Sequence, residues 1–267
     1  MSRPLVMGVV NVTPDSFSDG GRFFDSEAAI AQARRLIAEG ADILDIGGES
    51  TRPGAEPVPA EEELARVLPV IEAVRRESDA LISIDTMKPE VARAAVSSGA
   101  TIWNDVTALR ASPDSLKAAA ELGCEVVLMH MRGEPRTMQD NPRYEDVVAE
   151  VRDFLAERAR AAIAAGVRWE AISLDPGIGF GKTLAHNLAL LRNLPALAEL
   201  GFPLVLGVSR KRSIQAIDPT AADPSDRLGG SLALALWCAA HGASVLRVHD
   251  VRETVQALKV QAALAGA

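Results

Sequence analysis

The sequence predicts an α/β fold, a (β/α)8 or TIM barrel in which residues 1–267 form a single domain. Two observations support this prediction. Short apolar runs alternate with amphipathic stretches along the whole chain. The joints that lead into the apolar runs are short, whereas those that follow them vary in length and carry most of the unusual polar residues. An open, doubly wound sheet is the alternative architecture.

Eight short apolar segments are the expected strands. They are residues 5–10, 42–46, 81–84, 101–103, 125–129, 171–174, 204–207 and 244–248. Each is followed by a stretch with helical periodicity, which is clearest in residues 143–165. Residues 60–77 repeat the pattern behind an acidic first turn, 61–63, that suits the positive end of a helix.

Glycine marks nearly every joint between an expected helix and the next strand. The glycines are Gly40, Gly99, Gly123, Gly166, Gly201 and Gly242. Glycine at such a joint fits the left-handed residue that ends many helices. The joint at Ser78 and Asp79 is the exception.

Composition and the N-terminal sequence limit the partners and the compartment that we expect for the protein. Hydrophobic residues make up 48% of the chain, and the net charge of −8 argues against a nucleic-acid partner, which normally requires a basic face. Cys124 and Cys238 lie outside any CxxC pair and are expected to be buried thiols of a reducing compartment. The N-terminus lacks a secretory signal and no apolar run could span a bilayer, so we expect a cytoplasmic protein without membrane contact.

Polar residues follow all eight expected strands, where a barrel carries its chemistry. They are Asn11, the segment 45–52, Asp85, Asn104, Asp105, His130, Asp175, Lys211, Arg247 and His249. Each alone has a structural explanation: Asp85 could accept from loop N–H groups, and Asp250 with Glu253 resembles a helix cap. Polar residues after all eight strands together favour a functional site at this end of the barrel.

The polar set divides by charge. Asp85, Asn104 and Asp175 suit the donor edge of a planar nitrogen heterocycle. The cationic or potentially cationic side chains, which suit a phosphate or pyrophosphate, are Lys211, Arg247, His249 and Arg52. This division suggests displacement of a phosphorylated leaving group, a reaction normally assisted by Mg²⁺. The histidines lack the spacing of a zinc site.

The segment 172–183 imitates a nucleotide P-loop because it ends in Gly181-Lys182-Thr183. That motif requires a glycine five positions before Gly181, where this chain has Pro176. Proline has no N–H to direct at a phosphate, so we reject the P-loop. We expect instead an aspartate, Asp175, at a strand end, followed by a flexible loop, with Lys182 and Thr183 beginning the next helix.

Six segments, in order, resemble signature motifs of dihydropteroate synthase, an enzyme family of the folate pathway. They are residues 7–21 (Met-Gly-Val-Val-Asn-Val-Thr-Pro-Asp-Ser-Phe-Ser-Asp-Gly-Gly), 40–53, 129–138, 175–183, 209–211 and 247–250. The resemblance extends over nearly the whole chain. It implies the condensation of (7,8-dihydropterin-6-yl)methyl diphosphate with 4-aminobenzoate by an SN1-like displacement, in a homodimer.

The resemblance also implies roles for individual residues. The pterin is expected to bind to Asp85, Asn104, Asp175 and Lys211, with Met129 and Phe180 lining its pocket. Arg247 and His249 are expected to hold the diphosphate, and Asn11 to face Mg²⁺. Two mobile loops are expected to close over pyrophosphate and 4-aminobenzoate, one with Thr51 and Arg52 and the other with Asp15, Ser16 and Phe17. The expected catalytic set is Lys211, Arg247, His249, Thr51, Arg52 and Asp15.

One departure from the family pattern follows Arg212, where Ser213-Ile214-Gln215 replaces a bulky apolar residue, an aliphatic residue and glycine. It either alters affinity for aminobenzoate or sulfonamides or reflects a locally different helix start, and we favour the second explanation. Two other functions remain as alternatives: a pterin-binding methyltransferase that methylates a corrinoid, and a catalytically idle paralogue that binds pterin or a partner enzyme. The intact motif at 11–21 and the pair Arg247 and His249 argue against the methyltransferase, whose substrate has no diphosphate.

Overall fold

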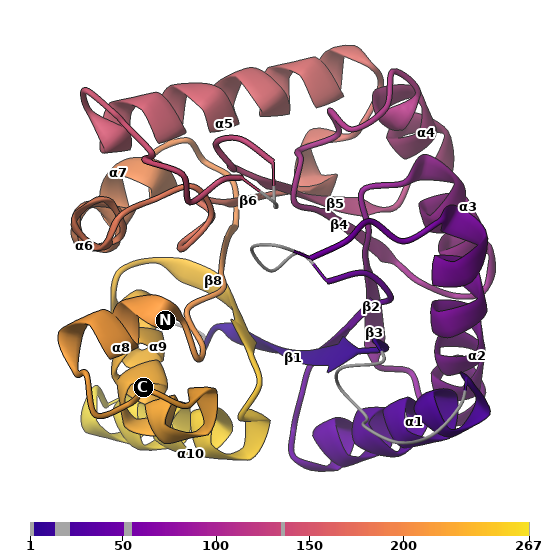
Figure 1. Ribbon diagram of the computed structural model, residues 1–267, viewed down its shortest axis with the longest axis horizontal. Coiled ribbons are helices and arrows are strands. Elements are labelled where there is room, and N and C mark those ends of the chain that lie inside the picture. The colour runs from indigo at the N-terminus through magenta and orange to yellow at the C-terminus, as the bar shows by residue number, and fades with distance from the viewer. Residues whose placement is uncertain (1–2, 14–21, 51–54, 135–136, 267) are drawn as a thin grey trace.

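The computed structural model describes residues 3–13, 22–50, 55–134 and 137–266. Its eight strands are β1 (Leu5–Asn11), β2 (Ile43–Gly47), β3 (Leu81–Asp85), β4 (Ile102–Asp105), β5 (Glu125–Met129), β6 (Ile172–Asp175), β7 (Leu204–Leu206) and β8 (Ala243–Val248). All neighbouring strands pair in parallel, and β8 returns to pair with β1, so the sheet is a closed barrel (Figure 1). The predicted (β/α)8 barrel is confirmed, and the open sheet is excluded.

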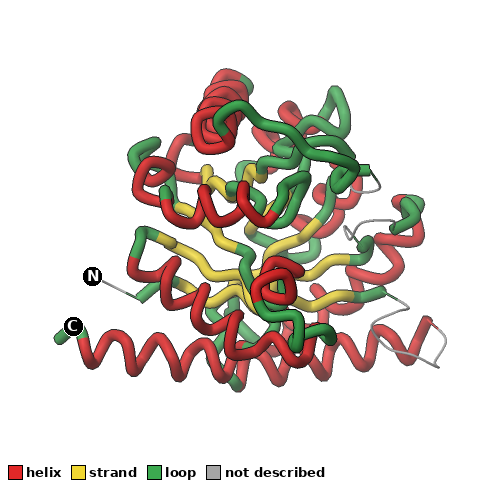
Figure 2. The backbone as a smooth tube through the Cα atoms, turned by 60° about the vertical axis from the view of Figure 1, so that its left-hand side comes forward, coloured by secondary structure: helices red, strands yellow, loops and turns green. Residues whose placement is uncertain are grey.

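Helices surround the barrel and follow the strands in turn (Figure 2). They are α1 (Arg22–Ala38), α2 (Ala60–Glu77), α3 (Pro89–Ser97), α4 (Ser115–Leu122), α5 (Val147–Ala164), α6 (Leu184–Arg192), α7 (Leu194–Ala198), α8 (Arg212–Ile217), α9 (Leu228–Ala240) and α10 (Val251–Leu264). Helix α2 has the predicted bounds. Helix α5 begins later than predicted because the side chain of Asp146 accepts hydrogen bonds from the N–H groups of Val148 and Ala149, which caps the helix at that point.

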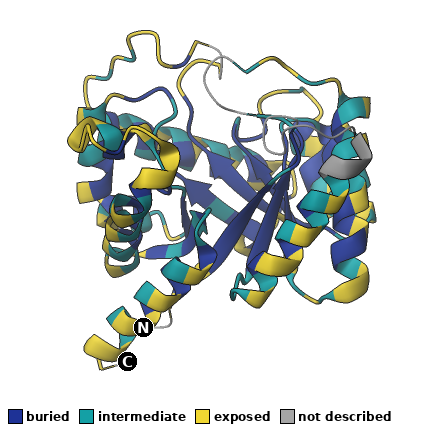
Figure 3. Ribbon diagram, turned by 60° about the horizontal axis from the view of Figure 1, so that its bottom comes forward, coloured by how far each residue is buried: buried dark blue, intermediate teal, exposed yellow. Residues whose placement is uncertain are grey.

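The core has two parts. An inner layer of apolar side chains fills the barrel and comes from six different strands: Met7, Ile43, Ile102, Val127, Val205 and Val245. A larger cluster lies between the strands and the helices that cover them. Figure 3 shows the result, with buried strands at the centre and exposed residues along the outer faces of the helices.

The glycine joints follow the prediction. Gly40, Gly99, Gly123, Gly166, Gly201 and Gly242 all have positive φ, between 61° and 114°. At the joint without glycine, Ser78 is extended, and the guanidinium of Arg75 donates to the carbonyl oxygens of Ser78 and Ala80. An arginine therefore holds the connection that lacks a left-handed residue.

Two further expectations concern single features. Cys124 and Cys238 are free and buried, as predicted. Within the described ranges, no helix combines the length and apolar character needed to cross a membrane.

Candidate active site

The alternation of side chains along the strands places the site directly above the inner apolar layer. Ile43, Ile102, Val127 and Val245 belong to that layer, and the residues two positions later on the same face are Asp45, Asn104, Met129 and Arg247. Because successive side chains of a strand point to opposite faces, residues two apart point the same way. The polar groups therefore project into the barrel at the carboxyl ends of its strands.

Arg247, which is half-buried, is at the centre of an ion cluster with two buried carboxyl groups. Its Nε donates to Asp45 at 2.6 Å, and its Nη2 donates to Asp85 at 2.8 Å. Asn104 donates from Nδ2 to Asp45 at 3.3 Å. Arg247, expected to hold diphosphate, thus contacts Asp85 directly and Asn104 through Asp45. The sequence placed Asp45 at a strand end without a role.

The charges in this cluster shift each other's ionisation. Burial and, after it, the neighbouring charge of Asp45 raise the pKa of Asp85 to about 7, against the opposing charge of Arg247. Burial disfavours the guanidinium of Arg247, but the charges of Asp45 and Asp85 outweigh it and raise its pKa. Arg247 is therefore a permanent cation between two carboxyl groups.

Asp85 has one carboxyl oxygen available to a ligand. Its Oδ2 accepts from Arg247, whereas its buried Oδ1 has no hydrogen-bond partner among the described residues. The structural explanation considered from the sequence, acceptance from loop N–H groups, is therefore wrong. A buried acceptor without a donor is costly unless a ligand supplies one. Asp85 can serve as such an acceptor for an N–H group of a bound ring.

Asp175 and Lys211 form the opposite side of the mouth. Oδ1 of Asp175 accepts from the N–H of Gly177 at 2.6 Å, and burial raises the pKa of its carboxyl group. Burial lowers the pKa of Lys211 to about 8, while the charge of Asp175 opposes the shift. The Lys211 ammonium lies 4.5 Å from the ring centroid of Phe180, a cation–π distance.

A cluster of soft apolar side chains lies beside these charges. Met129 packs with Val106, Met131 and Met138, and Met87 and Phe180 pack against them. Only Met129 and Phe180 are expected at the site from the sequence, although the cluster holds four of the six methionines of the chain. Methionine adapts its shape and contacts aromatic rings through a polarisable sulfur, so this surface suits a flat heterocycle.

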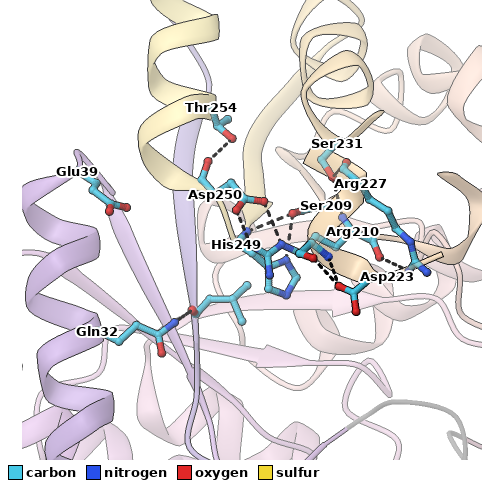
Figure 4. A network of polar contacts seen from close by, with 12 residues as sticks. Gln32, Glu39, Ser209, Arg210, Asp223, Arg227, Ser231, His249, Asp250 and Thr254 are labelled. Atoms are coloured by element: carbon cyan, nitrogen blue, oxygen red, sulfur yellow. Dashed lines mark hydrogen bonds and ion pairs between the residues drawn. The ribbon is translucent and has the colours of Figure 1, made fainter. Parts of the chain in front are cut away.

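His249 is linked to the neighbouring strand end by Ser209 (Figure 4). Its Nδ1 lies 3.0 Å from Oγ of Ser209, which also accepts from the backbone N–H of His249. Burial lowers the pKa of His249 to about 3, and the charge of Arg247 contributes in the same direction. This histidine, one of the cationic or potentially cationic side chains of the sequence, is therefore a neutral hydrogen-bonding group at neutral pH.

Asp250 has a different role from the one predicted. It makes no side-chain cap for α10 and instead binds Arg210, with distances of 3.1 Å from Nε to Oδ2 and 2.5 Å from Nη2 to Oδ1 (Figure 4). The bidentate pair joins the loop after β7 to the loop after β8. Since Arg210 precedes Lys211 and Asp250 follows His249, the pair fixes the spacing between two site residues.

The unusual Gln215 is part of the same region. Its Oε1 accepts from Nη2 of Arg227 at 2.8 Å, and the buried Arg227 also donates to the carbonyl oxygen of Arg210 at 3.1 Å. Ser213 is buried, and its Oγ finds no partner in the described part of the chain. The glutamine thus has a structural contact with Arg227, and the locally different helix start stays a prediction.

Two members of the strand-end set have structural roles. Asp105 accepts from the N–H groups of Thr107 and Leu109 and shapes the turn after β4. Glu49 forms an ion pair with Lys88, whose ammonium also contacts the fully buried Glu63 at 2.6 Å. These contacts hold the bases of the loops that surround the mouth.

Some expected site residues cannot be placed in this geometry. Asp15, Ser16, Phe17, Thr51 and Arg52 lie outside the described residues. Asn11 is half-buried at the end of β1, in register with Gly47. Over the described ranges, no group of three or more His, Cys, Asp or Glu side chains is arranged to hold a metal ion.

The fold and the site agree with a comparison against protein families. A family model described as "Pterin binding enzyme" matches residues 7–249. The chain is therefore an enzyme of the pterin-binding class. The mouth of its barrel combines buried carboxyl groups, cations and a methionine surface.

Individual relatives narrow this class. "Dihydropteroate synthase" of Escherichia coli (strain K12) is 50% identical over 260 residues, which cover 97% of this chain and 91% of the relative. A solved Xanthomonas albilineans dihydropteroate synthase with 4-aminobenzoic acid has a TM-score of 0.94 at 55% identity, covering 99% of this chain and 94% of that one. The Xanthomonas albilineans enzyme in complex with 7,8-dihydropteroate has a TM-score of 0.90 at 52% identity, covering 99% and 95%. The chain belongs to the dihydropteroate synthase family, transferases of folate biosynthesis.

Proposed function

We propose that the protein condenses (7,8-dihydropterin-6-yl)methyl diphosphate with 4-aminobenzoate, giving 7,8-dihydropteroate and pyrophosphate. The observation that carries this proposal is the unpartnered Oδ1 of Asp85, a buried acceptor in the same mouth as Asp175 and Lys211. Solved relatives contain 4-aminobenzoic acid in one case and 7,8-dihydropteroate in another. Donor groups of a pterin ring would satisfy the acceptors that the chain leaves available.

The pterin would bind to the half of the mouth that carries Asp85, Asn104, Asp175 and Lys211. Carboxyl groups would accept from the ring N–H and amino groups, while the Lys211 ammonium would donate to a ring oxygen or nitrogen. Met129 and Phe180 would contact the faces of the ring. The reacting methylene would then point toward Arg247 and His249.

Arg247 and His249 would hold the diphosphate as the bond between carbon and oxygen breaks. Arg247 supplies a fixed positive charge, and neutral His249 supplies a hydrogen bond without a proton transfer. Asn11 offers an amide oxygen, the kind of hard ligand that Mg²⁺ accepts together with substrate phosphates and water. Mg²⁺ would neutralise charge on the leaving diphosphate.

The aniline nitrogen of 4-aminobenzoate would then attack the pterin methylene with its lone pair and afterwards release one proton to solvent. The dihydropterin delocalises positive charge, so this SN1-like path needs no strong general base. We propose that Thr51, Arg52 and Asp15 contact the second substrate and pyrophosphate. These roles follow from the positions of the three residues within the family motifs.

A pyrophosphate-release assay tests the proposal. The purified protein should release pyrophosphate only when the pterin diphosphate, Mg²⁺ and 4-aminobenzoate are all present, and chelation of Mg²⁺ should stop release. Absence of release, with pterin binding still visible by calorimetry, would identify an idle binder. Methyl transfer from a methylated pterin to a corrinoid would identify the alternative enzyme class.

We also propose that residues 1–267 act as one domain, in a cytoplasmic homodimer. Three exposed apolar side chains on the adjacent helices α9 and α10 support the dimer: Trp237, Val260 and Leu264, with exposed fractions of 43%, 56% and 85%. The buried free thiols of Cys124 and Cys238 suit a reducing compartment. Light scattering should give a dimer mass, and Val260→Glu should reduce it to that of a monomer.

A further inference from the structure

The turn between β6 and α6 is held by neighbouring groups at almost every peptide unit. The N–H of Gly179 donates to Oδ1 of Asn187 at 2.8 Å, and the carbonyl oxygen of Gly179 accepts from Gln139 at 2.5 Å. The carbonyl oxygen of Gly181 accepts from the hydroxyl of Tyr144 at 2.8 Å. The flexible loop expected from the sequence is therefore a fixed turn.

Lys182 is at the centre of this turn and is only 3% exposed. Its ammonium donates to the carbonyl oxygens of Gly177 at 2.9 Å and Phe180 at 3.0 Å, and the carbonyl oxygen of His130 lies 3.3 Å away. The expectation that Lys182 begins the next helix is wrong, since α6 begins at Leu184 and is capped by Thr183.

His130 supplies the fourth acceptor around the ammonium. Its Nδ1 lies 2.9 Å from Nζ of Lys182. Burial lowers the pKa of His130 to about 3, and the charge of Lys182 acts in the same direction, so the ring is neutral and Nδ1 can accept. The ring packs edge-on against Phe154 at 4.8 Å, which fixes its orientation. A rigid imidazole at the end of β5 thus anchors a cation that belongs to the turn after β6.

The ionisation of Lys182 follows from the same surroundings. Burial lowers the pKa of Lys182 to about 7, and the charge of Asp175 opposes this shift. An ammonium has three N–H groups, and acceptors surround it on several sides. The geometry therefore favours the protonated form, which can donate to both ends of the turn at once.

The turn that Lys182 holds carries two groups of the pterin half of the mouth. Asp175 lies at the start of the turn and accepts a hydrogen bond from the N–H of Gly177. Phe180 lies near the end of the turn, with its ring centroid 4.5 Å from Nζ of Lys211. A Cβ at Gly179 would lie 3.3 Å from Cδ of Lys211, so the backbone of the turn is in close contact with that side chain. Small shifts of the turn would move Phe180 relative to both charges.

We propose that Lys182 is a positioning residue for the pterin site, where its buried ammonium ties the carbonyl groups of Gly177 and Phe180 to His130 and so fixes the Phe180 ring. This role rests on the proposed function, because it assumes that the pterin binds beside Phe180. Lys182 itself does not touch the substrate. Its effect is transmitted through the backbone that it holds.

Lys182→Met tests the role, because methionine keeps the length of the side chain and removes the donors. We expect the KM for the pterin diphosphate to rise on the order of tenfold, since hydrogen bonds from a buried charged group are among the stronger ones. The KM for 4-aminobenzoate should stay within about twofold, because the turn lies in the pterin half. Lys117→Met, on the exposed side chain of a lysine in α4, is the matched control and should change neither value.

A second variant protects the test if Lys182→Met folds poorly. Tyr144→Phe removes only the bond to the carbonyl oxygen of Gly181 and should raise the pterin KM in the same direction by less. Lys182→Arg retains a cation and should recover part of the loss. Calorimetry with a bare pterin separates the positioning role of Lys182 from the proposed condensation, since it reports pterin affinity even if no pyrophosphate is released. Unchanged pterin affinity in folded Lys182→Met, or equal losses for both substrates, would overturn the proposal.

Discussion

At the scale of single residues, Asp85 has an ionisation that can be tested through stability. Its pKa is raised from 3.8 to about 7, chiefly by burial and then by the charge of Asp45. Between these two values the folded state binds more protons than the unfolded state. The free energy of unfolding that Asp85 contributes therefore falls as the pH rises from about 4 to 7.

Asp85→Asn should remove this contribution. We expect the difference in unfolding free energy, wild type minus variant, to decrease between pH 4 and 7, as measured by urea unfolding across that range. Taking the difference cancels the opposite contributions of His130 and His249, whose pKa values are lowered. The exposed Asp114→Asn serves as the control. A pH-independent difference for Asp85→Asn would contradict the burial argument.

Asp175 and Lys211 are expected to bind the pterin directly. Asp175→Asn should cost about 2–3 kcal/mol of transition-state stabilisation, the scale of a hydrogen bond to a buried charge, read from kcat/KM for the pterin diphosphate. Lys211→Ala should reduce turnover severely for the same reason. Wild-type kinetics in either variant would remove that residue from the pterin role.

At the scale of elements, the joint between β6 and α6 shows how a glycine permits close approach. Gly177 has φ of +67°, and a Cβ there would overlap the carbonyl oxygen of His130, a backbone atom that cannot rotate away. Gly123, at the end of α4, has a similar φ of +61° but no atom within 4 Å of its hypothetical Cβ. The two positions share backbone strain and differ in packing.

Gly123→Ala should therefore cost only about 1–2 kcal/mol of stability, the penalty of a left-handed alanine. Gly177→Ala should cost more in urea unfolding and should also weaken pterin binding, because the turn must move away from β5. Calorimetry with a bare pterin provides the second measurement. Equal losses of stability, with pterin affinity intact in both variants, would show that the close approach of Gly177 to His130 affects neither stability nor pterin binding.

At the scale of the whole molecule, the site draws on strands from all around the barrel. Asp85 comes from β3, Asn104 from β4, Asp175 from β6 and Arg247 from β8. A ligand that contacts several of these groups ties together strands that are far apart in the sequence. Its binding free energy should therefore stabilise the barrel as a unit.

Scanning calorimetry can test this expectation. A pterin ligand at one hundred times its Kd should add about 2.7 kcal/mol to the unfolding free energy and raise the Tm of a single transition. A shift confined to one part of a two-step transition would show that the barrel does not unfold cooperatively.

The sequence predicted the barrel closely because its signals are local. Alternating periodicity located the strands to within two residues, and the glycines located the joints. It failed where a side chain finds a partner far along the chain. Asp45 and Arg247 are 202 positions apart, and nothing in the local pattern of Lys182 indicates that His130, 52 positions earlier, receives its ammonium. Asp250 was assigned to a helix cap for the same reason, since its partner Arg210 is 40 positions away.

The ion cluster around Arg247 has a consequence for selectivity among anions. The guanidinium already has two internal counterions, Asp45 and Asp85, so any anion from solution must compete with carboxylates fixed at 2.6 and 2.8 Å. We expect chloride or a single phosphate, which would contact only this side of the mouth, to compete poorly. Under the proposed function, a diphosphate joined to a pterin would also gain contacts at the opposite side of the mouth. We therefore expect the internal carboxylates to favour the linked substrate over small free anions.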